Sequence, residues 1–242
     1  MYYMDRIGKE NNMSLEPGGR SDKYGNKYEN RYLAKLLLQL VKENLTGVTV
    51  EPLGLYQDSI EFITEQNNTA IQYYQCKASN KTQQSWSIAD LKKYEVFSRA
   101  KEIILNGQNR HYYFISPLQY NELDELCKRA GTNASSDDFV QCQLTNEKLR
   151  KLFKKCAIAF GYDTTNSVDV ERLVYILSHC HFEQYTFGIE TEQVLEEQIS
   201  ILFTGKSTTV RSMLENYAND TNHYGRKITA KDVIDYLKNN NI

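Results

Sequence analysis

The chain has 242 residues, of which 40% are hydrophobic and 25% charged, so it can bury the core of one large domain or of a domain with a small second lobe. Its formal net charge of −2 argues against a dedicated nucleic-acid coat protein, although a local basic cleft is compatible with this balance. Residues 1–13 lack an apolar signal core and no apolar run of about 18 residues occurs, so no membrane segment is expected. The five cysteines form no CxxC pair, which predicts reduced thiols and a cytoplasmic location.

The first part of the chain predicts a helix followed by three strands and a second helix. Apolar residues recur on one side of a helix over residues 27–44. The period then changes to that of short strands, over residues 48–51, 58–64 and 70–78. A second helix is expected over residues 87–106.

The second predicted helix has a clear start, and a fourth strand follows it. Ser87 with Asp90 three residues later forms a capping-box pattern. The fourth strand covers residues 111–116 and ends before Pro117. The resulting order is helix, three strands, helix, strand, which predicts a mixed central sheet of four strands flanked by helices.

The remainder of the chain has a helical pattern, apart from a short strand expected at residues 182–187. The helices are expected over residues 120–130, 146–160, 168–178, 191–202, 208–219 and 230–238. The loop at residues 131–138 is the best candidate boundary. We therefore expect an α/β core at residues 1–130 and an α-helical lobe at residues 131–242, either separate or packed on the core as one domain.

Glu29 lies on the apolar side of the first predicted helix. At about 100° per residue, Leu33, Leu36 and Leu40 fall within roughly 40° of it. A charge on a stripe that faces the core needs a partner or a metal. The alternative is that Glu29 ends the stripe and reaches water.

The predicted hairpin gathers further polar residues. With a two-residue turn at residues 67–68, Asp58 lies opposite Lys77, and Gln75 shares their face because side chains alternate along strands. Glu61, three residues after Asp58, faces the other side and ranks below it as a candidate acid. The alternative for Asp58 and Lys77 is a cross-strand ion pair on a solvated sheet, worth under about 1 kcal/mol.

These residue types suit phosphodiester hydrolysis, which uses a divalent cation to neutralise charge on the phosphate and an activated water. Mg²⁺ prefers oxygen ligands and takes few of them from the protein. Asp58 would be the main ligand, and the Gln75 carbonyl and Glu29 would complete the site, directly or through water. Lys77 would orient or activate the water. The residues therefore predict a Mg²⁺ or Mn²⁺ site.

This order of elements, with Gln75-Cys76-Lys77 on the hairpin, resembles the PD-(D/E)XK nuclease superfamily, whose core has the restriction-endonuclease fold. Many members have Glu-x-Lys where this chain has Gln-x-Lys, a variant typical of Mrr-like restriction endonucleases. Residues 18–91 are also similar to nuclease effector domains of bacterial antiphage systems, notably at residues 18–29 and 58–62. Such domains occur in CD-NTase-associated endonucleases, in Lamassu effectors and in antiviral STAND NTPases (Avs).

The resemblance implies Mg²⁺-dependent cleavage of double-stranded DNA after phage sensing, with Glu29, Asp58, Gln75 and Lys77 as site residues. It also implies activation by clustering, as a homo-oligomer or through a sensor or ATPase module in the same or another chain. One alternative is a catalytically weak or inactive nucleic-acid-binding or oligomerisation module, which a glutamine at position 75 would suit. Another is RNA cleavage at the same site.

Two tentative substrate contacts lie near the start of the first helix. Arg20 and Lys23 are candidates for binding the phosphate backbone, and a capped helix start explains them equally well. Two other motifs are discounted. Gly205-Lys206-Ser207 resembles the end of a P-loop, but Ser200 stands where the motif requires glycine. His179-Cys180-His181 lacks a second cluster with zinc-ligand spacing, so a helix end that contains histidine is the better interpretation.

Overall fold

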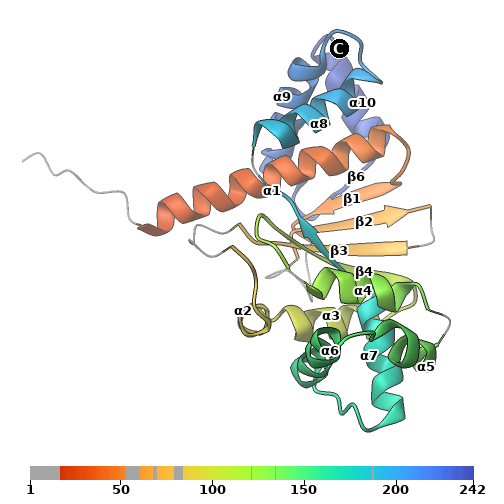
Figure 1. The fold of residues 1–242 in the computed structure, drawn as a ribbon. Coiled ribbons are helices and arrows are strands. Elements are labelled where there is room, and N and C mark those ends of the chain that lie inside the picture. The colour runs from red at the N-terminus through yellow and green to blue at the C-terminus, as the bar shows by residue number, and fades with distance from the viewer. Residues whose placement is uncertain are drawn as a thin grey trace, which may run out of the picture.

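A six-stranded mixed sheet lies between two layers of helices (Figure 1). The computed structural model describes residues 17–52, 60–67, 70–78, 84–120, 122–133, 135–186 and 188–242, with side chains from residue 25 onward. The strands are β1 (Gly47–Val50), β2 (Phe62–Gln66), β3 (Ala70–Cys76), β4 (Arg110–Ser116), β5 (Cys180–Gln184) and β6 (Lys227–Ile228). Their order across the sheet is β5-β4-β3-β2-β1-β6.

The sheet is antiparallel on one side and parallel on the other. β1 pairs antiparallel with β2 and β6, and β2 pairs antiparallel with β3. β3, β4 and β5 pair in parallel, and the connections between them contain helices, as parallel strands require. The expected mixed central sheet flanked by helices is therefore confirmed, with six strands in place of four.

One face of the sheet is covered by the long helix α1 (Pro17–Val41) together with α8 (Ile189–Ser200), α9 (Ser207–Ala218) and α10 (Ala230–Asn239). Leu33 and Leu37 of α1 are almost fully buried against Phe62 and Tyr74 of the sheet. The apolar stripe expected on this helix therefore packs on the sheet.

The other face is covered by the remaining helices, which surround Tyr112 and Phe114 of β4. These are α2 (Ile88–Lys93), α3 (Val96–Leu105), α4 (Glu122–Gly131), α5 (Ser136–Asp138), α6 (Glu147–Phe160) and α7 (Ser167–His179), with a π-helical turn at Phe139–Gln143. A 3-10 turn at Thr221–His223 precedes β6 in the sequence.

The single helix expected over residues 87–106 is interrupted. Glu95 has φ of 58°, in the left-handed region, and this separates α2 from α3. The expected start is confirmed: the Ser87 side chain accepts from the Asp90 backbone, and the Asp90 side chain accepts from the Ser87 backbone. The second capping box, Thr229 with Asp232, begins α10 in the same way.

The part of the chain after residue 131 is not purely helical. It supplies β5 and β6, the strands at the two edges of the sheet, of which only the first was anticipated. Both hydrophobic clusters also draw side chains from each side of the loop at residues 131–138. β5 and β6 pair with strands that are far away in the sequence, so a local pattern of apolar residues does not predict these pairings.

Among the described helices, none combines the length and apolar character needed to cross a lipid bilayer.

Candidate active site

The hairpin of β2 and β3 has a different register from the one expected. Phe62 pairs with Tyr74 and Gln66 with Ala70, so residues 67–69 lie between the paired ends. A two-residue turn would have paired Phe62 with Tyr73 instead. Hairpin connections of three residues are common, and a shift by one residue moves every side chain of a strand to the other face. The expected register is therefore wrong by one position.

A second irregularity lies just before β2. Ile60 and Phe62 would share a face of a regular strand, but they are buried in the two clusters on opposite faces of the sheet. The Glu61 backbone N–H donates to the Tyr74 carbonyl (2.9 Å), although Tyr74 is the register partner of Phe62. Strict alternation therefore does not extend to Glu61, and the prediction that it faces away from Lys77 is wrong.

Glu61 is held beside the end of β3 by two contacts. Its Oε2 accepts a hydrogen bond from the Cys76 backbone N–H (2.7 Å), and its Oε1 accepts one from Lys77 Nζ (3.4 Å). The exposed fraction of the side chain is 11% for Glu61 and 32% for Lys77. The carboxyl group is thus buried, while the ammonium group of its partner reaches the surface.

Two further carboxyl groups are electrostatically coupled to the same lysine. Burial raises the pKa of Glu61 to about 8, Lys77 opposes this rise and Glu29 adds to it. Burial also raises the pKa of Glu29, Lys77 opposes the rise and Glu51 adds to it. The pKa of Glu51 is raised by its burial and lowered by Lys77. These four residues form one group, called the carboxylate–lysine cluster below.

Backbone hydrogen bonds fix three of the four cluster positions relative to the sheet. The Glu51 N–H donates to the Glu61 carbonyl (2.9 Å), immediately after β1. The Lys77 N–H donates to the Ile115 carbonyl of β4 (2.8 Å). Glu29 comes from α1, whose neighbouring Tyr28 is fully buried. The cluster therefore stands on rigid elements at the carboxyl end of β3.

The structure brings together two of the four predicted site residues, Glu29 and Lys77. Asp58 lies outside the described residues, as do the side chains of Arg20 and Lys23, so their roles stay predictions. Gln75 is 3% exposed, and its Oε1 accepts a hydrogen bond from the Tyr112 hydroxyl inside the sheet–helix core.

Sequence reasoning did not single out Glu51, and it ranked Glu61 below Asp58. The available signal for Glu61 was its position between Ile60 and Phe62, where a charge would be buried whichever way the strand turned. For Glu51 we find no local signal, because its φ of 44° redirects the chain just after β1.

Basic side chains of α1 join this helix to neighbouring elements. Arg31 forms an ion pair with Glu192 of α8 (2.7 Å), and Lys35 forms one with Glu183 of β5. These charges attach α1 to its neighbours.

The cluster offers oxygen ligands that suit a hard divalent cation. In the described part of the chain, no three acidic, histidine or cysteine side chains converge at metal-binding spacing. Mg²⁺ nevertheless takes one or two carboxylates from proteins and keeps several waters. The donor set of the cluster fits such an ion.

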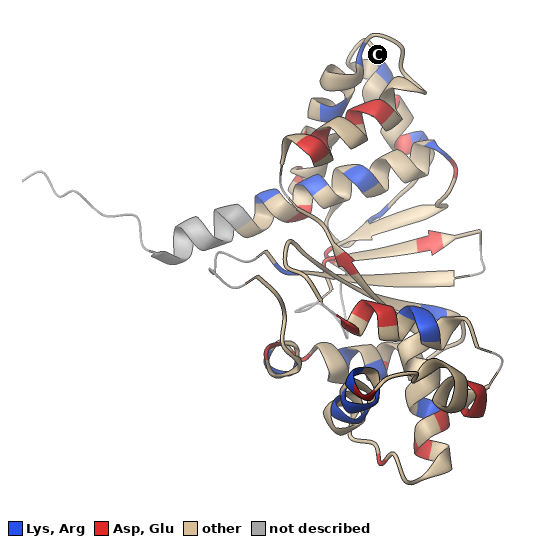
Figure 2. Ribbon diagram, viewed as in Figure 1, with Lys and Arg blue, Asp and Glu red and all other residues tan. Residues whose placement is uncertain are grey.

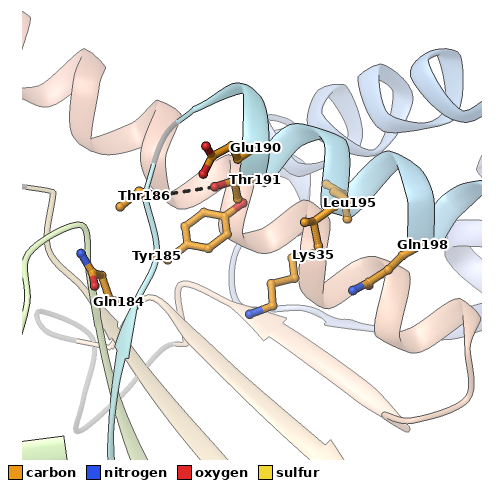
Figure 3. Close-up of a pocket in the computed structure, with 9 residues that line it drawn as sticks. Lys35, Gln184, Tyr185, Thr186, Glu190, Thr191, Leu195 and Gln198 are labelled. Atoms are coloured by element: carbon orange, nitrogen blue, oxygen red, sulfur yellow. Dashed lines mark hydrogen bonds between the residues drawn. The ribbon is translucent and has the colours of Figure 1, made fainter.

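A separate cavity of about 350 Å³ lies between α1, α8 and the chain after β5 (Figure 3). Lys35 lines it beside Tyr185, with the ammonium group 5.6 Å from the ring centroid. Thr186 and Thr191 are hydrogen-bonded to each other (3.5 Å), and Glu190 adds a negative charge. Because Lys35 is already paired with Glu183, this cavity lacks the free cations that a polyanion would need.

No family model matches the chain, and no curated protein matches its sequence. Among solved structures, it is similar to the Cap4 SAVED/CARF-domain containing receptor of Moraxella osloensis, with a TM-score of 0.55 and 16% identity. The Acinetobacter baumannii Cap4 receptor with the cyclic trinucleotide 3'3'3'-cAAA gives a TM-score of 0.54 and 12% identity. The same receptor with 2'3'3'-cAAA gives 0.53 and 13%.

These similarities cover most of this chain and less than half of each receptor. The covered shares are 89% of this chain and 47% of the Moraxella receptor, and 88% and 46% for the Acinetobacter receptor with 3'3'3'-cAAA. At such low identity, the comparison establishes a shared fold over that length.

Proposed function

We propose that this chain is a metal-dependent nuclease that cleaves double-stranded DNA as an effector of antiphage defence. The observation that carries the proposal is the carboxylate–lysine cluster, in which three carboxyl groups share a single lysine at the carboxyl end of β3. A purely structural ion pair would need one carboxylate for Lys77, and Glu61 already fills that role.

The raised carboxyl pKa values are the physical reason to expect a cation. Three carboxylates at partly buried positions repel one another and lose hydration, so their charged forms are unfavourable without compensation. A divalent cation would supply that compensation, with Glu61 and Glu29 as the described residues best placed to hold it and Asp58 as a further predicted ligand. When bound, it would neutralise negative charge on the phosphate and lower the pKa of a water.

Lys77 has the position expected of a group that orients water and stabilises charge. Its ammonium group is restrained by Glu61 Oε1, 3.4 Å away, yet it remains partly exposed. A restrained cation next to the reacting phosphate stabilises developing charge without having to reorganise during the reaction.

The fold supports this proposal without identifying the chemistry. α1, the antiparallel strands β1 to β3, the helices α2 and α3, and the parallel strand β4 follow the order expected from the resemblance to PD-(D/E)XK nucleases. The likeness to Cap4 receptors agrees with a role beside cyclic-nucleotide sensing, as in the CD-NTase-associated endonucleases that the sequence resembles.

Cleavage of plasmid DNA with Mg²⁺ or Mn²⁺ tests the proposal. We expect the wild-type chain to nick and linearise the plasmid, and Lys77→Ala, Glu61→Gln and Asp58→Ala to be strongly impaired. Lys231→Ala is the matched control, because Lys231 is an exposed lysine of α10 that pairs with neighbouring Asp235. Equal cleavage by Lys77→Ala and the control, or no cleavage by the wild type at any protein concentration, would contradict the proposal.

A second candidate function is binding of a cyclic oligonucleotide. It is favoured by the two Cap4 structures that contain cyclic trinucleotides, since this chain shares its fold with just under half of each of those receptors. The cavity beside Lys35 argues against it, because its single lysine is neutralised. Titration calorimetry with 3'3'3'-cAAA distinguishes the candidates: we expect no binding, and tight binding together with no DNA cleavage would favour the sensor.

A further inference from the structure

Helix α8 carries an exposed stripe in which acidic and apolar residues alternate. Glu190, Val194, Glu197 and Ile201 follow one another at intervals of four, three and four residues, so they fall within roughly 60° of one another around the helix. The exposed fraction is 53% for Val194 and 77% for Ile201. This spacing is typical of a helix that places one face on a partner.

Helix α6 carries a stripe of the same geometry and opposite charge. Lys148, Lys151, Lys155 and Ile158 also lie within roughly 80° of one another, and Ile158 is 73% exposed. Beside this stripe is a hollow of about 520 Å³ between α2, α4 and α6. Its lining combines apolar side chains with two lysines and one glutamate, and includes Trp86, Ile88, Leu123, Leu152, Lys92, Lys155 and Glu122.

The charges at the centre of each stripe lack partners in the described part of the chain. Glu190 and Glu197 have no ion pair there, whereas their neighbours Glu192 and Glu196 are paired with arginines of α1 and α9. Lys155 and Lys92 likewise have no ion pair within the described residues. On the α6 surface, Lys148 pairs with Glu122 and Lys151 pairs with Glu147, so the unmatched charges there are those of Lys92 and Lys155. Each surface therefore presents two unmatched charges of one sign beside exposed apolar side chains.

The two stripes cannot meet within one molecule. α8 belongs to the helical layer on one face of the sheet and α6 to the layer on the other face (Figures 1 and 2). Figure 2 shows acidic residues along α8 and basic residues along α6, at opposite poles of the fold. A contact between them has to join two copies of the chain.

We propose that α8 of one copy docks on α6 and the adjoining hollow of a second copy, in a head-to-tail contact. Glu190 and Glu197 would face Lys92 and Lys155, and Val194 and Ile201 would be buried against Ile158 and the apolar floor. Because the two surfaces differ, a pair of docked copies still has one free α8 surface and one free α6 surface. The contact therefore generates open chains or rings and not a closed two-fold dimer. This assembly surface lies outside the carboxylate–lysine cluster and does not depend on nuclease activity.

Charge reversal on each stripe tests the contact by sedimentation velocity. One variant combines Glu190→Lys with Glu197→Lys, and the other combines Lys92→Glu with Lys155→Glu. The control combines Lys231→Glu with Lys238→Glu on α10, which makes the same change in charge as the lysine variant at another place. Protein concentrations from about 1 μM to 1 mM cover the affinities expected of such a contact.

We expect the average mass of the wild type and the control to rise with concentration and to fall when salt is added, because the contact is partly electrostatic. Each stripe variant alone should need at least about a hundredfold higher concentration to assemble, since like charges then face each other. An equal mixture of the two variants should assemble again, because each reversed stripe now fits the other. Misfolding of a variant could not produce this rescue.

Three results would overturn the proposal. The wild type could stay monomeric throughout, the mixture could fail to assemble, or assembly could be unchanged in both variants. If the lysine variant instead loses binding to a fluorescent DNA duplex while its mass is unaffected, the α6 stripe is a nucleic-acid surface and not a contact between copies.

Discussion

Two groups of titratable residues lie at opposite ends of the parallel strands. The carboxylate–lysine cluster lies at the carboxyl end of β3, and a histidine group lies near the amino ends of β4 and β5. In the latter, His111 Nδ1 lies 3.0 Å from His181 Nε2, and the His111 ring centroid lies 4.8 Å from that of His179. Tyr113 stacks on His181 with ring centroids 4.3 Å apart.

Burial shifts both groups toward their neutral forms but leaves them in different states. Burial lowers the pKa of His181 to about 4, with smaller contributions from His111, His179 and Lys128, so the imidazole is neutral and simply packs. In the cluster, by contrast, three carboxyl groups remain coupled to one charged lysine. Groups whose pKa is shifted and that remain coupled to a neighbouring charge are better candidates for function than groups whose pKa is shifted but that are neutral and stacked.

Ring packing holds the histidine motif in place. Tyr113 packs on His181 and Tyr175 packs on His179. The expectation of a helix end that contains histidine is confirmed, since α7 ends at His179.

The largest expected effect is a loss of DNA cleavage on mutation of the carboxylate–lysine cluster but not of the histidine group. Lys77→Ala should lower DNA cleavage by at least about 100-fold, as removal of one preorganised charge-stabilising group does in other enzymes. His181→Gln, at the other end of the strands, should leave the cleavage rate within about twofold of the wild type, because it contacts no part of the cluster. Initial rates of plasmid nicking measure both. A comparable loss in His181→Gln would remove the distinction between the groups.

The second prediction concerns stability at high pH. Glu61 binds its proton more tightly in the folded chain, with a pKa of about 8 against an ordinary value of 4.5, so folding is favoured most at low pH. Stability contributed by this group should decline as the pH rises from 4.5 to about 8 and then level off. Glu61→Gln should remove this decline.

Urea unfolding midpoints in the presence of a chelator, measured between pH 5 and 9, test the prediction for Glu61. Lys77→Ala should extend the same decline to higher pH, because loss of the cation that favours the carboxylate raises the pKa of Glu61 further. An unchanged slope in Glu61→Gln would show that Glu61 is ionised across this range.

The third prediction has the opposite sign, at the other end of the strands. His181 has a folded pKa of about 4 against an ordinary value of 6.5, so its unfolded form binds more protons between these values. The stability that it contributes is complete above pH 6.5 and is lost as the pH falls toward 4. His181→Gln, which keeps a polar group near His111, should flatten the acid limb of the unfolding curve and leave the alkaline limb unchanged.

The smallest predicted effect tests whether Gln75 belongs to the core or to the cluster. Tyr112→Phe removes the hydroxyl that donates to Gln75 Oε1, and it should cost about 1 to 3 kcal/mol of unfolding free energy because a buried acceptor loses its partner. If Gln75 acts only in the core, cleavage by the folded variant should be unchanged. A loss of activity larger than the loss of folded protein would place Gln75 in the site, as the sequence suggested.

Local sequence patterns determined the order of elements from α1 to β4 apart from the break between α2 and α3, the capping box at Ser87 and the apolar stripe of α1. They also related Glu29 to Lys77, because a charge on a buried stripe and a lysine at the end of a strand are each visible in their own segment. These features depend on interactions between residues that are close in the chain, and such interactions leave a periodic signature.

Tertiary structure alone decided which acid joins Lys77. The one-residue shift of the hairpin and the change of face between Ile60 and Phe62 brought Glu61 to the end of β3 and left Gln75 bonded to Tyr112. Pairing between strands also set β5 and β6 at the edges of the sheet. Register and long-range pairing are determined by the total packing of two faces, and no single segment of the sequence encodes them.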